Sequence, residues 1–122
     1  MNIDKLIEKL KNVPVLKSSK STGRRRYNVI ACTLDKKGKV ISIRTNDYNC
    51  THPKQKYYAE KAGKSEAIYL HAEISALISS KREVHSILVA RIGRDGKPRC
   101  AKPCPICQLA IKEYHVKNII CT

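Results

Sequence analysis

Short β-branched runs alternate with helical segments along this chain of 122 residues, and that alternation restricts the fold more than any other feature. A strand pattern at 86–92 precedes a helical pattern from about 105 to 115, and a last strand pattern follows at 118–121. A strand, a helix and a strand in this order predict a parallel section of sheet. Two earlier runs, 27–34 and 39–44, are joined by a glycine-containing turn and predict an antiparallel hairpin.

Three further segments have helical spacing, a capping residue or both. They are 1–14, 54–62 and 71–80. The third contains mostly apolar residues, which predicts a helix packed inside the molecule. The stretches 46–53 and 98–103 have loop composition. The expected architecture is therefore an α/β fold with a mixed sheet, a hairpin followed by parallel strands.

The length of the chain suits one domain over residues 1–122, because its 42% apolar residues suffice for one packed core. No apolar run approaches the roughly 18 residues of a membrane span. The first ten residues mix charge into every turn and lack the apolar core of a signal peptide. We therefore expect a cytoplasmic protein without a membrane partner, in a bacterial or virus-infected cell among others.

The charge of the chain is strongly unbalanced. Lysine and arginine total 25 against 10 acidic residues, a formal net charge of +15. The densest segment, 17–26, contains no acidic residue, is expected to be a loop or flexible arm, and includes Arg24, Arg25 and Arg26 as candidate phosphate or nucleic-acid contacts. Such a surface can simply be a solvated one. Its positive field nevertheless favours partners that carry phosphate.

Six cysteines are present, and two of them form a C-x-x-C pair, Cys104 and Cys107, preceded by proline. Without a secretory signal, this spacing favours metal or redox chemistry over a disulfide framework. Cys32 and Cys121 lie inside apolar runs, where a cysteine is usually an inert core residue.

Two short motifs open two of the predicted helices, His71-Ala72-Glu73 and the segment 103–107, and 33 residues separate His71 from Cys104. Parallel strand–helix units would bring both helix starts to one edge of the sheet. A helix N-terminus stabilises thiolates, so one imidazole and two thiolates offer three ligands to zinc and leave its fourth position open. Glu73, two residues past the histidine, is a better acid/base group than a ligand.

The combination of H-x-E with P-C-x-x-C is the signature of zinc deaminases that act on cytosine or adenine. Over about residues 27–121 the chain resembles the zinc-dependent cytidine/deoxycytidylate deaminase superfamily, most closely its small phage-type deoxycytidylate deaminase-like proteins. The resemblance implies a three-layer α-β-α fold, here without the C-terminal fifth strand. It also implies that His71, Cys104 and Cys107 bind Zn²⁺ and that Glu73 carries protons.

The resemblance further implies a substrate pocket. Members place an asparagine after the second strand to contact the sugar, which corresponds to Asn46, with Asn49 as the fallback. The other candidate substrate contacts are Tyr48, His52 and Ala72. The segment 44–47 departs from the G-Y-N-G pattern of members regulated by a triphosphate, so such control is not expected. A second subunit is expected to complete the pocket, which implies a homo-oligomer.

Three functions remain open at this stage. The first is hydrolytic deamination of a free cytosine nucleotide, dCMP or a related one, to its uracil form and ammonia. The second is deamination of cytosine in single-stranded DNA or RNA, which the charge favours but the absence of Trp and Phe disfavours. The third is a non-catalytic nucleic-acid-binding module in which Cys100 or His115 completes a closed structural zinc site.

Overall fold

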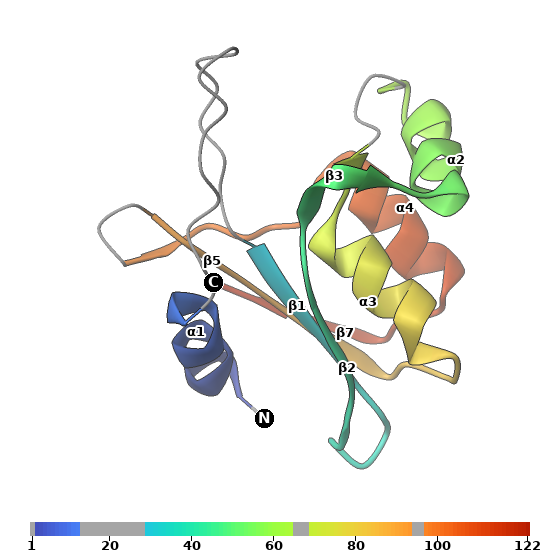
Figure 1. The fold of residues 1–122 in the computed structure, drawn as a ribbon. Coiled ribbons are helices and arrows are strands. Elements are labelled where there is room, and N and C mark those ends of the chain that lie inside the picture. Colours follow the sequence, from blue (N-terminus) through green and yellow to red (C-terminus); the bar gives the residue numbers. More distant parts are fainter. Residues whose placement is uncertain (1, 13–28, 65–68, 94–96) are drawn as a thin grey trace.

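The computed structural model describes residues 2–12, 29–64, 69–93 and 97–122, and at 48–50 and 69 it describes the backbone alone. One sheet forms the middle layer, and in the described part of the chain helices lie against both of its faces (Figure 1). This arrangement confirms the expected three-layer α-β-α architecture. The basic segment 17–26 lies outside the described residues.

The helices and strands correspond closely to the segments with strong local signals. In chain order the elements are α1 (Ile3–Lys11), β1 (Val29–Leu34), β2 (Val40–Thr45), β3 (Asp47–Thr51), α2 (Pro53–Lys61), β4 (Tyr69–Leu70), α3 (Ala72–Ser80), β5 (Ser86–Ile92), β6 (Pro98–Arg99), α4 (Pro105–Glu113) and β7 (Asn118–Cys121). No helix in the described ranges is long and apolar enough to cross a membrane.

The main sheet is mixed, as the order of elements predicts. Strands β1 and β2 form the antiparallel hairpin, and β1 also pairs antiparallel with β5 along its whole length. The other edge of β5 is shared by β7, which pairs with it in parallel, and by β6, which pairs with it antiparallel. The parallel pair β5–β7 and the intervening helix α4 confirm the predicted strand–helix–strand unit.

The expectation of a missing fifth strand is wrong, because the sheet has five strands. The additional strand is the two-residue β6, within the stretch 98–103 that has loop composition. The chain folds back after β5, where the amide of Gly93 donates to the carbonyl of Lys97 at 2.9 Å, and Arg99 then pairs with Arg91. Strand β6 thus depends on its partner strand and carries no strand signal of its own.

The stretch 46–53 also differs from its expected loop structure. It contains β3, which pairs with β4 in a separate two-stranded sheet. The two strands are separated by α2, so their pairing is a tertiary contact that local composition does not encode. Because β4 leads directly into α3, this small sheet helps to place the start of that helix.

The alternation of side chains along β1 and β5 divides the apolar residues between two cores. Even-numbered residues face α1, and odd-numbered residues face α3 and α4. Leu6 and Leu10 of α1 are fully buried against the first face, whereas Ile74, Leu77 and Ile106 fill the second. The two motifs of interest lie at the starts of α3 and α4 and therefore on the second face.

Candidate functional site

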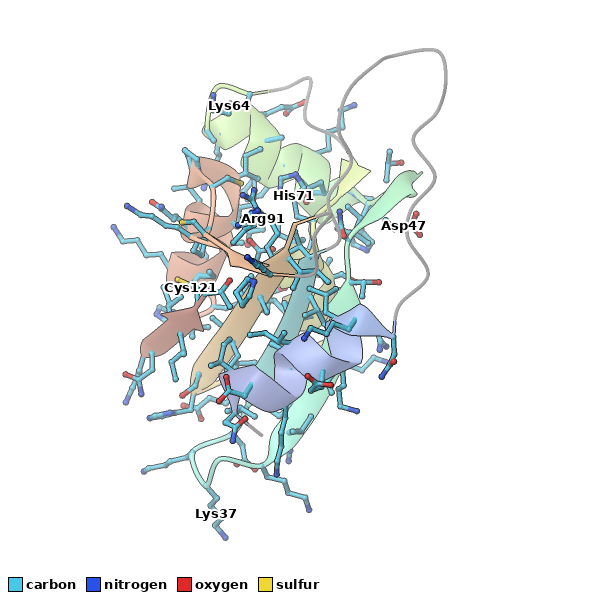
Figure 2. The ribbon with its side chains drawn as sticks, turned by 90° about the vertical axis from the view of Figure 1, so that its left-hand side faces the viewer. Lys37, Asp47, Lys64, His71, Arg91 and Cys121 are labelled. Carbon is cyan, nitrogen blue, oxygen red and sulfur yellow. The ribbon has the colours of Figure 1, made fainter. Side chains whose placement is uncertain are left out.

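The two motifs meet at the starts of α3 and α4. His71 is the N-cap residue of α3 and Cys104 is the N-cap residue of α4, and Cys107 lies in the first turn of α4. An N-cap side chain normally accepts a hydrogen bond from its own helix, but neither of these does. Both side chains are directed instead toward each other, at the end of the sheet where His71 is labelled in Figure 2.

The three side chains form a compact donor group. Nδ1 of His71 lies 3.3 Å from Sγ of Cys107 and 3.5 Å from Sγ of Cys104, and all three donor atoms lie within 4.8 Å of one another. A tetrahedral zinc centre separates such atoms by about 3.5–3.8 Å, given its usual bond lengths. These residues could therefore hold a metal ion, with Nδ1 as the histidine donor.

Cys100 does not belong to this donor group, nor does any other His, Cys, Asp or Glu that the structure describes. Cys100 is exposed on the loop before α4 and lines the adjacent cavity. The described residues therefore provide three ligands, which is the number typical of a catalytic zinc site, whereas structural sites have four. This favours an open fourth position over the closed structural site.

The pKa values of the two thiols, Cys104 and Cys107, shift in opposite directions because the thiols share one hydrogen bond. The hydrogen bond from Cys107 lowers the pKa of Cys104 to about 4, with a further contribution from His71, against the opposing effect of burial. The same hydrogen bond and deep burial raise the pKa of Cys107. Because cysteine binds a metal as the thiolate, metal binding would release the protons that these thiols retain.

Gln55 supports the metal group from α2. Its side chain is fully buried, and its Oε1 accepts a hydrogen bond from the backbone N–H of His71 at 3.2 Å. This contact restrains the histidine at the point where β4 ends and α3 begins. Sequence reasoning did not single out Gln55, since a glutamine within a polar helical segment carries no local sign of a tertiary role.

Glu73 lies in the first turn of α3 and is only 6% exposed. It lines a cavity of about 200 Å³ together with His71, Ala72 and Cys104, and burial raises the pKa of its carboxyl group. It does not belong to the three-residue donor group. The structure therefore places a buried carboxyl group beside the metal donors, where it can exchange protons with a molecule in the cavity.

The second wall of the cavity comes from the sheet and includes Asn46, which is buried. Its Oδ1 accepts a hydrogen bond from the backbone N–H of Val29 at 3.0 Å, so the side chain also ties β1 to the end of β2. Ala72 is fully buried and lines the cavity from the helix side. The structure thus brings Asn46 and Ala72 to the same cavity as Glu73.

The remaining predicted substrate contacts either lie away from the cavity or belong to side chains that the structure does not describe. His52 is the N-cap residue of α2, where its Nδ1 accepts from the backbone N–H of Lys54 at 3.1 Å, and it is not among the residues that line the cavity. For Tyr48 and Asn49 the structure describes the backbone alone, and Arg24, Arg25 and Arg26 fall outside the described residues.

The comparison with protein families shows which family the chain belongs to. The model of the cytidine and deoxycytidylate deaminase zinc-binding region matches residues 5–122 of this chain. The chain belongs to this family. The search of curated proteins gave no match. The metal of this deaminase domain is zinc, and its His/Cys/Cys group is consistent with that ion.

The deaminase domain has further cavity residues that were not predicted to contact the substrate. Arg91 comes from β5, and Cys100, Ala101 and Lys102 come from the loop after β6. A signal for Arg91 was present, because it is a charged residue within the otherwise apolar strand SILVARI. Nothing in the sequence distinguished Lys102 from the many other basic residues of this chain.

Proposed function

We propose that this protein hydrolyses the amino group of a free cytosine nucleotide, dCMP or a related one, to give the uracil nucleotide and ammonia. Family membership supports zinc-dependent deamination of cytidine-type substrates in general. The observation that carries the proposal is the placement of Glu73, a buried carboxyl group in the wall of a cavity shared with His71 and Cys104. A purely structural zinc site has no need of such a group.

In this proposal His71, Cys104 and Cys107 hold the zinc ion and Glu73 carries protons. Zinc, when bound, supplies a Lewis acid that lowers the pKa of water toward about 7. Water provides the new oxygen on C4, and the bond from C4 to the amino nitrogen breaks. Glu73 receives a proton from the water and passes protons to the base, so that one ends on ring nitrogen N3 and one on ammonia. Its raised pKa helps it to hold a proton between these transfers.

The rest of the site positions the nucleotide. Asn46 and Ala72 lie in the cavity wall and are proposed to contact the sugar and the base. Tyr48 and His52 stay predicted contacts, as do Arg24, Arg25 and Arg26, which would contact phosphate or nucleic acid. The homo-oligomer and the cytoplasmic location also stay predictions, and light scattering of the purified protein would measure the first.

The second candidate is deamination of cytosine in single-stranded DNA or RNA. The net charge of +15 favours it, because a polymer offers many phosphates to many cations. A polymer substrate would lose affinity steeply between low and moderate salt, whereas a mononucleotide would lose little. The non-catalytic module is the weaker alternative, since Cys100 lies outside the metal donor group.

Product analysis by mass spectrometry tests the proposal. The zinc-loaded protein is offered cytidine, deoxycytidine, their mono- and triphosphates and a cytosine-containing oligonucleotide in parallel. A mass gain of one dalton in a free nucleotide, absent with Glu73→Ala at equal zinc content, is the expected result. A gain confined to the oligonucleotide would replace the proposal with the second candidate. A zinc-loaded protein that changes none of these compounds would overturn it.

A further inference from the structure

The sheet wall of the cavity contains a cation, Arg91, at the carboxyl end of the central strand β5. Ile87 and Val89 face α3 and α4, and because side chains alternate along a strand, Arg91 faces the same side. Figure 2 shows Arg91 at the end of the sheet that holds His71, with Lys37 of the β1–β2 hairpin at the far end. Arg91 is the charged residue of β5 and is half-buried at the cavity.

The backbone of Arg91 is held firmly in place. It pairs with Val29 of β1 on one side and with Arg99 of β6 on the other. Its backbone N–H also donates to Oγ1 of Thr122 at 3.3 Å. A partly buried side chain on so restrained a backbone starts from a defined position, which reduces the entropy lost when it binds a ligand.

The second cation of the cavity, Lys102, comes from the loop that leads into α4. Thr122 holds this loop as well, because its carbonyl accepts from the backbone N–H of Ala101 at 3.0 Å. Its own backbone N–H donates to the carbonyl of Val89 at 3.2 Å. Thr122 therefore connects strand β5, which carries Arg91, to the loop that carries Lys102, through backbone hydrogen bonds.

The charges around the cavity favour an anion. Glu73 is the acidic residue among the lining residues, and Arg91 and Lys102 are the two cations. A zinc ion with two thiolates and a neutral imidazole is electrically neutral, so it does not cancel the two cations.

We propose that Arg91 and Lys102 bind the phosphate group of the substrate nucleotide and so select nucleotides over nucleosides. The guanidinium fork of Arg91 matches two phosphate oxygens, and the ammonium of Lys102 supplies a mobile second charge. This proposal rests on the proposed function, since it assumes that the cytosine nucleotide enters this cavity. It assigns the phosphate to a free monophosphate, and the backbone of an oligonucleotide is the other source of the same group.

Equilibrium binding of the reaction product tests the site without turnover. The zinc-loaded protein is titrated separately with deoxyuridine monophosphate, with deoxyuridine and with a uracil-containing single-stranded oligonucleotide. We expect the monophosphate to bind about tenfold to a hundredfold more tightly, as is typical of a hydrogen-bonded charge pair. In Arg91→Gln this preference should largely disappear, while the affinity for deoxyuridine changes less than about threefold. In Lys102→Gln it should fall by a smaller factor.

Two matched controls separate a phosphate site from general loss of positive charge. Arg99→Gln removes the exposed arginine directly opposite Arg91 on β6, and Lys112→Gln removes an exposed lysine of α4. Neither residue lines the cavity, so both variants should keep the preference. If Arg91→Gln fails to fold, Arg91→Lys keeps the charge without the fork, and the exposed Lys102 remains testable. Unchanged preference in both Arg91→Lys and Lys102→Gln would then refute the proposal.

The possible results of this experiment are distinct. Equal binding of nucleotide and nucleoside by the wild-type protein, or a preference that survives in Arg91→Gln, overturns the phosphate site. A preference that depends on Arg91, without deamination of any cytosine compound, keeps the phosphate site and rejects the proposed function. An Arg91-dependent preference for the oligonucleotide over the monophosphate, lost steeply with salt, would assign the cations to a polymer backbone and overturn the choice of a free nucleotide.

Discussion

At the scale of single residues, the chemistry of the site was predictable where it depends on local sequence. His71, Glu73, Cys104 and Cys107 occur in short motifs at helix starts. The structure groups the donor atoms of His71, Cys104 and Cys107, and it places Glu73 in the cavity that His71 and Cys104 also line. Gln55 and Arg91 were missed because their roles depend on what the fold brings close, namely the amide of His71 and the cavity. When the partner of a residue is distant in sequence, the local sequence gives only a weak signal of its role, such as a charged residue in a mostly apolar strand.

The two buried cysteines that lie on opposite faces of the sheet permit a matched test of the metal group. Cys107→Ala removes a donor, so we expect zinc content to fall from about one per chain to near zero and the melting temperature to drop. Cys32→Ala removes an equally buried sulfur from the α1 face and should cost about 1 kcal/mol while zinc stays bound. Elemental analysis with thermal unfolding measures both, and full zinc in Cys107→Ala would contradict the assignment.

The supporting role of Gln55 leads to a second test at this scale. Gln55→Met removes the acceptor for the His71 amide, and we expect zinc affinity to fall about tenfold, as is typical when a supporting contact of a metal ligand is lost. Cobalt(II) bound in place of zinc should show an altered absorption spectrum.

Thr33→Val serves as the control for Gln55→Met. It removes a buried hydrogen bond of 2.6 Å to Ser80 at the other end of α3 and should leave both zinc affinity and cobalt spectrum unchanged. An unaltered affinity and spectrum in Gln55→Met, or equal changes in both variants, would limit Gln55 to packing.

At the scale of elements, the segments with their own periodicity or caps were predicted, whereas the short strands β3, β4 and β6, which need a partner strand to form, were not. Strand β5 has the predicted bounds, and α1 lies within the predicted segment 1–14, where the side chain of Asn2 caps it by accepting from the backbone N–H of Lys5 at 2.9 Å. Strands β3 and β4 form where a segment distant in sequence offers hydrogen-bonding partners, and β6 forms where the chain folds back onto β5. The β1–β2 hairpin is the opposite case, since its turn carries its own stabilising side chain.

Asp35 organises that turn and predicts how stability depends on pH. Its Oδ1 accepts from the backbone N–H groups of Lys39 at 2.8 Å and Lys37 at 2.9 Å, and these hydrogen bonds lower its pKa, as Arg82 does at 3.6 Å. A carboxyl group with a lower pKa in the folded state stabilises the fold at neutral pH and loses this effect as pH falls through that pKa. Asp35→Ala should therefore melt a few degrees below wild type at pH 7.

The difference between Asp35→Ala and wild type should shrink below about pH 4, where the unfolded carboxyl group also becomes protonated. Asp35→Asn keeps an acceptor oxygen without the charge, so its loss at pH 7 should be smaller than that of Asp35→Ala, and the difference between the two variants should be nearly independent of pH. Melting curves from pH 3 to 8 compare the three proteins. A constant gap between Asp35→Ala and wild type over this range would show that the charge of Asp35 does not contribute.

At the scale of the whole molecule, two cores lie back to back on the shared strands β1 and β5. One core contains α1, and the other contains α3, α4 and the metal group. The mixed sheet was predictable from the order of helices and strands, and the three layers from the family resemblance. Which helices cover which face was not predictable, because that choice depends on how the crossovers pack. Among the described residues, α1 lies on one face of the sheet and α3 and α4 lie on the other.

The two cores predict additive effects of the metal and of α1. Leu10→Ala opens a cavity at a fully buried position and should cost about 2–5 kcal/mol, and the milder Ile7→Val about 1 kcal/mol. Removing zinc with a chelator withdraws the stabilisation that metal binding adds on the other face. Because the perturbed groups lie in separate cores on opposite faces of the sheet, the two losses in unfolding free energy should add within about 0.5 kcal/mol.

Urea unfolding of wild type, Ile7→Val and Leu10→Ala, each with and without chelator, measures whether the two losses add. A chelator effect that vanishes in the α1 variants would mean that α1 is needed to form the metal site, and the two faces would then have to be treated as one core.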